Sequence, residues 1–142
     1  KNKIYRYMKV INIFNSESEK LEIHKDSRGV IADVFYNTNI QHVAMIKSEP
    51  NVIRGNHYHK ETTQHMLMTS GSLEYWYKDV DSKDPAKMYL CKAGDLITTN
   101  PYEIHALKIT DEGNEFIVFS QGKRGGMDYE SDTYRVDSII EN

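Results

Sequence analysis

Hydrophobic residues in this 142-residue chain recur in short runs rather than at helical spacing. No window of about a dozen residues keeps apolar positions at i, i+3, i+4 and i+7 without interruption. Instead, runs rich in Val, Ile, Tyr, Phe and Thr follow one another closely, which is typical of strands. Ten such runs predict strands over residues 30–37, 42–47, 52–59, 63–70, 72–80, 87–92, 95–100, 103–110, 114–121 and 132–140.

The segments between these runs carry turn-forming residues. They read KDSRG, KSEPN, TSGS, DSKDP, KAGD and TDEGN. Closely spaced short strands joined by such turns are typical of a β-sandwich or β-barrel. We therefore predict an all-β fold in which the strands close into a barrel, as a single domain over residues 1–142. Residues 1–8 are expected to be a linker or a cloning remnant, with Met8 as a candidate native start.

Composition narrows the function classes. The net charge is −3 and the pI is about 6.1, so no broad basic face is available for nucleic acid, which we exclude as a partner. No run approaches the roughly 18 apolar residues that span a bilayer, so we predict no membrane insertion. The single cysteine, Cys91, cannot form an internal disulfide, which indicates a reducing, cytoplasmic location.

The stretch 54-RGNHYHKETTQHMLMTSG-71 contains the candidate chemistry. In an extended strand His57 and His59 project to the same face. Gln64 begins the returning strand and can lie beside them, and His105, which enters a later strand, can complete the cluster. Three imidazoles and an amide oxygen suit a divalent ion such as Zn, Fe, Mn or Ni. If a metal is bound, we expect His57, His59, Gln64 and His105 to hold it.

The same residues resemble a known family. His57-x-His59, Gln64 and Gly71 resemble the first cupin motif, and the stretch from Gly94 to His105 resembles the second. The resemblance extends from about Asp26 onward and implies a cupin β-barrel, a jelly-roll sandwich.

Three stretches resemble the sugar-nucleotide group within the cupins: 27-SRGVIADVF-35, 54-RGNHYHK-60 and 129-YESDTYRV-136. This group contains the 3,4-ketoisomerases of deoxysugar biosynthesis and the C-terminal cupin domain of bifunctional capsule polysaccharide enzymes that act on 4-keto nucleotide sugars. The resemblance implies proton transfer next to the ketone of a nucleotide-linked 6-deoxy sugar.

Two features of the resemblance point in opposite directions on the metal. Gln64 replaces the glutamate that usually binds metal in cupins, and a similar glutamine goes with metal-independent ketoisomerases. His105, however, occupies the second-motif ligand position that those ketoisomerases tend to lose. The second motif also has Asn100 and Tyr102 where proline and glycine are usual. A metal-bound and a metal-free site therefore both remain open.

Proton transfer next to a carbonyl requires a base and a group that holds the enolate oxygen. We predict His59 as the base, with His57 as the alternative, and the other imidazole, a metal ion or Arg54 on the oxygen. Glu103 is an alternative carboxylate base. The candidate substrate-binding residues are Arg54, Lys60, Tyr75, Tyr77, Tyr102 and Glu103, with the basic pair for the diphosphate and the aromatic residues for the sugar.

Several of these residues also have a structural interpretation. Arg54 can pair with a carboxylate such as Glu74, and Gln64 can be a buried amide satisfied by the backbone. Tyr75 and Tyr77 are interpreted first as core or subunit interface, and only second as a sugar platform. His65 would point away from Gln64 and is expected to have a packing or surface role.

Three functions are consistent with these residues. The leading hypothesis is an isomerase or epimerase of a nucleotide-linked 4-keto-6-deoxy sugar. The second is a metal-dependent cupin of another class, such as a dioxygenase. The third is a module that binds a sugar or small acid without chemistry. We expect a homodimer, because small barrels often associate through an edge strand or an outer sheet.

Overall fold

The computed structural model of the chain describes residues 8–15, 22–122 and 131–141, and within these ranges it contains strands but no helix. The prediction of an all-β fold is confirmed. The strands are β1 (Lys9–Asn12), β2 (Ile23–Asp26), β3 (Gly29–Ala32), β4 (His42–Ser48), β5 (Ile53–Tyr58), β6 (Thr63–Asp79), β7 (Lys87–Lys92), β8 (Asp95–Thr99), β9 (Glu103–Gln121) and β10 (Tyr134–Arg135).

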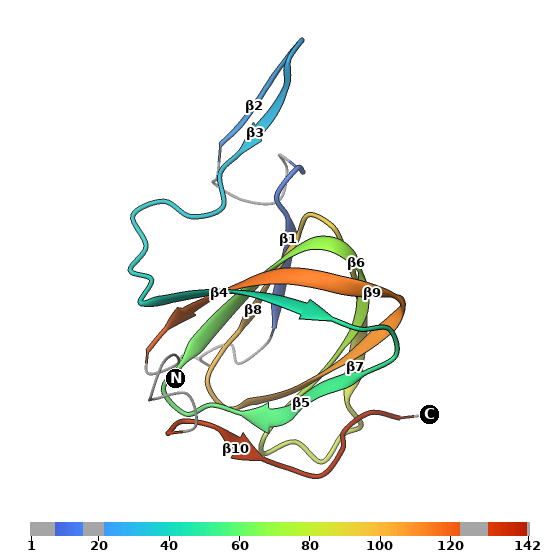
Figure 1. Cartoon of the computed structure of the whole chain (residues 1–142). Helices are drawn as coiled ribbons and strands as arrows, with labels where there is room; N and C mark the ends of the chain where they lie inside the picture. The colour runs from blue at the N-terminus through green and yellow to red at the C-terminus, as the bar shows by residue number, and fades with distance from the viewer. Residues whose placement is uncertain (1–7, 16–21, 123–130, 142) are drawn as a thin grey trace.

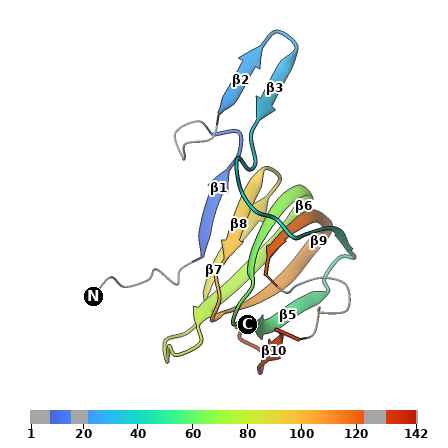
Figure 2. The same cartoon turned by 90° about the vertical axis from the view of Figure 1, so that its left-hand side faces the viewer.

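Eight of these strands form one sheet that curls around an interior (Figure 1). Its order is β1-β8-β6-β9-β5-β10, with β4 joined to β9 and β7 joined to β6. The long strands β6 and β9 pair along almost their whole length and hold the barrel together. The other two strands, β2 and β3, form a hairpin that projects from the barrel (Figure 2).

The sharp curvature of β6 and β9 depends on a pair of glycines. Gly71 and Gly113 both have a φ of 70°, and a Cβ built on Gly71 would overlap the carbonyl oxygen of Gly113. Only glycine allows this approach, and the register of the two strands shifts beside it. The predicted turns TSGS and TDEGN are therefore wrong, because each is a bend within one continuous strand.

Three other boundaries differ from the prediction. The strand expected over residues 30–37 covers Gly29–Ala32, and the strand expected over residues 132–140 covers only Tyr134–Arg135. β1 was not predicted, and it forms by pairing with β8. Met8 packs against the hydrophobic core, so this residue of the expected linker belongs to the packed structure.

The barrel interior contains an apolar core. Its buried members are Met66, Met68, Leu73, Tyr75, Cys91, Ile97, Leu107, Ile109, Phe116 and Val118. Most come from β6 and β9, whose alternate residues face inward. Outside the barrel, Phe35 packs edge-on against His65 and Phe119 at 4.9 Å, which agrees with a packing role for His65. The described residues include no helix long and apolar enough to cross a membrane.

Candidate functional site: a histidine cluster inside the barrel

A bulge in β5 aligns this strand with β9. Gly55 and Asn56 have φ values of 87° and 56°, and the register shifts between Gly55 and His57. A Cβ on Gly55 would lie 2.8 Å from the carbonyl oxygen of His105, so glycine is required for the close approach of the two strands. The bulge leaves His57 directly opposite His105 in the ladder.

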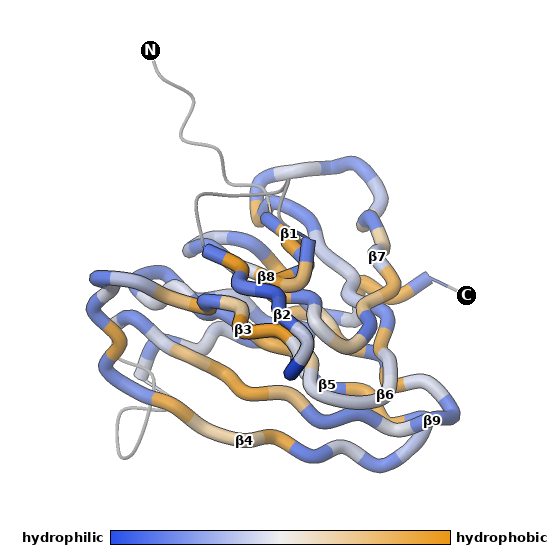
Figure 3. Tube along the Cα trace, turned by 90° about the horizontal axis from the view of Figure 1, so that it is seen from above, coloured by the Kyte–Doolittle hydropathy of each residue, from blue (hydrophilic) through white to orange (hydrophobic). Residues whose placement is uncertain are grey.

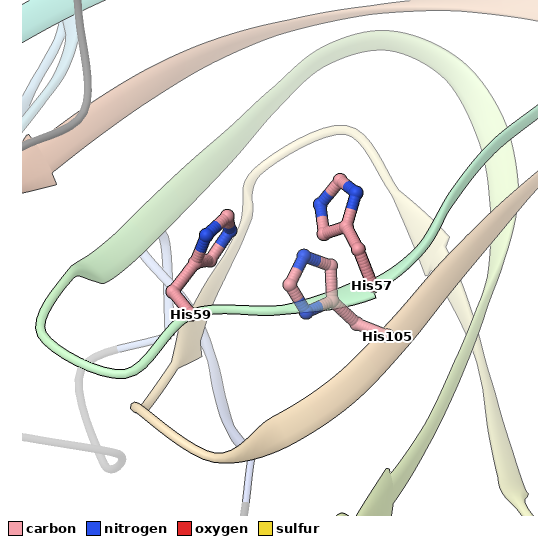
Figure 4. Close-up of side chains that lie close together, drawn as sticks. All are labelled: His57, His59 and His105. Atoms are coloured by element: carbon pink, nitrogen blue, oxygen red, sulfur yellow. The ribbon is translucent and has the colours of Figure 1, made fainter. Parts of the chain in front are cut away.

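The structure brings His57, His59 and His105 together. One nitrogen from each ring lies within 4.8 Å of the others, and the three side chains gather inside the barrel from the β5 segment and from β9 (Figure 4). The distance between ring centroids is 4.6 Å for His57 and His105, 5.0 Å for His57 and His59, and 5.3 Å for His59 and His105. None of the three is more than 8% exposed.

Backbone carbonyls determine which nitrogen carries the proton in two of these rings. The Nδ1–H of His59 donates to the carbonyl oxygen of Asp132 at 2.8 Å, and the Nδ1–H of His105 donates to that of Glu103 at 3.1 Å. A carbonyl only accepts, so Nδ1 carries the proton and Nε2 of each neutral ring has the lone pair. Both rings therefore offer a basic nitrogen.

A cavity of about 350 Å³ opens beside the cluster. Of the three histidines, His57 and His105 line it, together with the buried amide of Gln64. Apolar side chains of β4, β5, β6 and β9 complete its wall, which gives the cavity both polar and apolar surfaces. This composition is typical of a small-molecule site.

Two arginines also line this cavity. Arg54 donates from Nε to the hydroxyl of Ser48 at 2.8 Å, and not to Glu74, whose carboxylate accepts from the Trp76 indole at 3.0 Å. The alternative pairing of Arg54 with Glu74 is therefore wrong. Arg135, in β10, lies opposite His57 in register, which places it on the same row of the sheet.

Arg135 was not among the residues predicted from the sequence. It lies within the stretch YESDTYRV that carries the family resemblance, and this resemblance was the feature of the sequence that could have identified it as a site residue. Its position at the cavity depends on the pairing of β10 with β5, which joins segments far apart in the chain.

Tyr75 lies behind the cluster rather than in the cavity. It is fully buried, its ring is nearly parallel to that of His105 at 6.3 Å, and its hydroxyl bonds to that of Thr99. Burial raises the pKa of the Tyr75 hydroxyl well above its usual value. Tyr75 is thus part of the core, as its structural interpretation predicted.

Tyr77 and Glu103 line a second, smaller cavity of about 110 Å³. Glu103 is 1% exposed, and burial, with a smaller contribution from the charge of Asp79, raises the pKa of its carboxyl to about 8. Hydrogen bonds from Tyr75 and from the backbone of Met8 offset part of this effect. Glu103 thus lines a different cavity from His57, and the structure does not bring it to the large cavity as a base.

Lys60 and Tyr102 lie away from the large cavity. The Tyr58 ring, which alternates with His57 and His59, stacks on Tyr134 at 5.3 Å and on Tyr102 at 6.3 Å. The ammonium of Lys60 lies 4.2 Å from the centre of the Tyr134 ring. The structure therefore does not bring these two predicted substrate-binding residues to the histidine cluster.

The donor set fits a divalent ion. Imidazole nitrogens suit Zn, Fe, Mn or Ni, and the backbone carbonyls that hold His59 and His105 fix ring orientation as second-layer partners do in metal sites. Gln64 adds a neutral amide oxygen at the same cavity. The set contains no carboxylate, so it would hold such an ion through neutral ligands.

A curled all-β barrel with histidines gathered in its interior from two strand segments is the arrangement of the cupin fold. Residues 24–133 match the family model described as the polysaccharide biosynthesis C-terminal domain, and the chain belongs to that family. No curated protein matches the sequence.

Solved structures with the same fold include sugar-nucleotide enzymes. The sugar 3,4-ketoisomerase QdtA from Thermoanaerobacterium thermosaccharolyticum, in complex with TDP, is 18% identical, with a TM-score of 0.69 over 94% of this chain and 90% of that chain. The TDP-quinovose 3,4-ketoisomerase WlaRB from Campylobacter jejuni is 20% identical, with a TM-score of 0.70 over 91% and 92%.

An epimerase shares the fold as well. The dTDP-4-dehydrorhamnose 3,5-epimerase from Sulfolobus tokodaii is 20% identical, with a TM-score of 0.65 over 84% of this chain and 76% of that chain. The cupin jelly-roll predicted from the motifs is therefore confirmed.

Proposed function

We propose that the protein is an isomerase or epimerase of a nucleotide-linked 4-keto-6-deoxy sugar in polysaccharide or deoxysugar biosynthesis. The observation that carries this proposal is the buried histidine cluster beside a cavity that two arginines also line. It is supported by the polysaccharide biosynthesis family and by enzymes with similar folds, which include a TDP-quinovose 3,4-ketoisomerase and a dTDP-4-dehydrorhamnose 3,5-epimerase.

We assign His57 as the base. It lines the cavity, whereas His59, the base predicted from the sequence, is 2% exposed and is held by Asp132. A neutral His57 takes the acidic proton from the carbon next to the ketone, and the electron pair moves to the carbonyl oxygen as an enolate. For ketoisomerisation, the neighbouring hydroxyl passes its proton to the enolate oxygen, and protonated His57 delivers its proton to the former carbonyl carbon. For epimerisation, a proton reaches the original carbon from the opposite face of the sugar ring, and His57 releases its own proton to solvent.

The two arginines take separate roles in this proposal. The hydroxyl of Ser48 and the carbonyl of Lys47, which accepts at 3.4 Å, hold the Arg54 guanidinium. A donor fixed before reaction is what enolate stabilisation requires, so we assign Arg54 to the oxygen. Arg135, on the short outer strand β10, is assigned to the diphosphate, which a planar guanidinium binds through paired hydrogen bonds.

A metal-dependent cupin, such as a dioxygenase, is the second candidate. It is favoured by the two imidazoles whose Nε2 atoms have the lone pair. His57, His59 and His105, with Gln64, would hold the ion, which when bound would supply Lewis-acid polarisation of a substrate oxygen. Elemental analysis and oxygen uptake separate the candidates: stoichiometric iron with oxygen consumption favours the dioxygenase.

The decisive experiment uses a dTDP- or UDP-linked 4-keto-6-deoxy sugar in heavy water. Proton NMR would follow deuterium incorporation at the carbons next to the ketone. We expect incorporation that depends on the protein, followed by a new ketone or an inverted centre. If neither sugar exchanges while the protein binds it, the protein is the binding module instead.

We also propose that the protein forms a homodimer through its outer apolar surface. Val43 and Met45 on β4 are 57% and 60% exposed, and Ile31 on the projecting hairpin is 67% exposed. Hydrophobic stretches are visible along β3 and β4 (Figure 3). Light scattering should give twice the mass of one chain, and Met45→Glu should shift it toward one. A monomeric wild-type protein at micromolar concentration would contradict this proposal.

A cytoplasmic location remains part of this proposal. Cys91, the single cysteine, is fully buried, and burial raises the pKa of its thiol, so it is held as an unreactive core residue. Fractionation of cells that express the protein would test the location.

A further inference from the structure

The C-terminal segment 131–140 runs along the outside of β5, and we call it the strap. β10 pairs Tyr134 with Tyr58 and Arg135 with His57. Beyond this pair, the amide of Val136 donates to the carbonyl of Asn56 at 2.9 Å, and that of Ile139 donates to the Asn56 side chain at 3.0 Å. These contacts fall on the part of the chain that carries two of the three clustered histidines.

Asp132 makes the densest contact between the strap and that segment. Its carboxylate accepts from the amides of Lys60, Glu61 and Thr62 and from the Thr62 hydroxyl, each at 2.9 Å. Asp132 is 4% exposed and Thr62 is fully buried. Hydrogen bonds to an ionised acceptor are among the strongest in proteins, so the carboxylate fixes the connection between β5 and β6.

The backbone of the same residue holds a ring of the site. The Asp132 carbonyl oxygen is the acceptor for the His59 Nδ1–H at 2.8 Å. The Asp132 side chain therefore binds the residues immediately after His59. Its main-chain carbonyl binds the imidazole of His59 itself. With the carboxylate bonds in place, the carbonyl cannot move away from the ring without breaking them.

We propose that Asp132 is a positioning residue that keeps the His59 ring in its Nδ1–H tautomer, with the lone pair on Nε2. Any effect of His59 on activity, as the neighbour of His57 in the cluster, rests on the proposed function, but the tautomer and its dependence on Asp132 do not. Free histidine in water favours the opposite tautomer, so a strap-imposed preference is measurable. Asp132 touches no reacting atom and acts only through His59 and the connection that follows it.

Three variants isolate this role. Asp132→Asn keeps the size of the side chain but removes its charge. It also places the side-chain NH2 group next to backbone amides that can only donate. Thr62→Val removes one of the four bonds to the carboxylate and leaves Asp132 intact. Asp137→Asn makes the same chemical change as the first variant at an exposed position of the strap, and it is the matched control.

The direct readout is the tautomer, measured by long-range 1H–15N correlation spectra of histidine-labelled protein treated with a chelator and free of substrate. His59→Gln assigns the signal. We expect the Nδ1–H pattern in the wild type and in Asp137→Asn. We expect mixed tautomers in Asp132→Asn. In both Asp132→Asn and Thr62→Val, the backbone amides of Glu61 and Thr62 should exchange with solvent faster. Where Asp132→Asn does not fold, the wild-type pattern and Thr62→Val decide.

Activity provides the second readout. If the sugar substrate is turned over, we expect kcat to fall about 10- to 100-fold in Asp132→Asn with KM nearly unchanged, as for other residues that orient a site group. A wild-type His59 with its proton on Nε2 would overturn the proposal. So would an Asp132→Asn protein that loses thermal stability while its tautomer and its exchange at 60–62 match the wild type.

Discussion

The barrel has two differently filled halves, and both are built on β6 and β9. In the apolar half, Leu73, Tyr75 and Ile109 are at most 1% exposed and belong to the hydrophobic core. In the histidine half, Gln64 and His105 are each 3% exposed and line a cavity. The same two strands thus bury apolar groups in one half and polar groups in the other.

The apolar half mainly stabilises the fold, whereas the histidine half contains the groups for chemistry. Burying apolar surface stabilises the fold by about 25 cal/mol per Å². Burying a polar group costs free energy unless it is hydrogen-bonded, and bonded pairs contribute only about 1 kcal/mol each. The histidines are therefore held by directed contacts, such as that of His59 with Asp132, whereas the hydrophobic burial beside them comes from the core residues of the cavity wall, Met66, Leu107, Phe116 and Val118. Substitutions in the histidine half should lower activity and leave stability nearly unchanged. Substitutions in the apolar half should lower stability and leave the activity of the folded protein nearly unchanged.

The largest expected effect is on catalysis by the histidine half. His57→Gln should lower deuterium exchange into the keto sugar by about 10²- to 10⁴-fold, because it removes the assigned base. The melting temperature should change little. His24→Gln, on the projecting hairpin, is the control and should keep full exchange. Exchange that survives in His57→Gln would assign the base elsewhere in the cluster.

The apolar half should give the reverse result. Leu73→Ala removes a fully buried side chain and should lower the free energy of unfolding by about 2 to 5 kcal/mol in urea titrations. Because Leu73 does not line the large cavity, the remaining folded protein should keep its exchange rate. A large loss of rate per folded molecule would show that the apolar core also controls the chemistry.

A smaller effect concerns Glu103, which lies between the halves. The pKa of its folded-state carboxyl is about 8, above the usual 4.5, so the native state binds a proton that the unfolded state has released. The protonated Glu103 carboxyl contributes its full stabilisation below about pH 4.5. As the pH rises from about 4.5 to about 8, the free energy of unfolding falls by at most about 1.4 kcal/mol per pH unit. Glu103→Gln should remove this slope in urea titrations between pH 5 and 8, and an unchanged slope would contradict the assignment.

The smallest effect tests the metal preference. Gln64→Glu places a carboxylate at the cavity beside His57 and His105. Its charge should tighten binding of Zn²⁺ or Mn²⁺ by about tenfold, or about 1.4 kcal/mol, in competition titrations with a chromophoric chelator. Thr69→Ser, on the exposed part of β6, is the control. Equal affinity in both variants would show that residue 64 does not contribute to a metal site.

The sequence predicted the strands and the histidine cluster because their signals are local or follow motif spacing. His57 and His59 share a face through alternation alone, and the cupin motif places His105 near them. The merged strands β6 and β9 were not predictable from a window of residues. Gly71 indicates a turn locally, and only its opposition to Gly113 makes it a bend.

The remaining site residues depend on contacts between distant segments. Arg135 reaches the cavity because β10 pairs with β5, and Asp132 contacts residues about 70 positions earlier. Tyr102 and Lys60 are near the histidines in the chain, but alternation and the tyrosine stack direct them to the outside. A prediction from nearness in sequence therefore placed Lys60 and Tyr102 at the site wrongly. It also missed Arg135 and Asp132.

The most direct test is a crystal structure of His57→Gln with a bound TDP-linked 4-keto-6-deoxy sugar, in which the lost base traps the substrate. We expect the sugar in the large cavity, with the carbons next to its ketone facing residue 57 and its diphosphate at Arg135. Nucleotide sugar bound outside the barrel, for example over Tyr102 and Tyr134, with the cavity left to solvent, would contradict it.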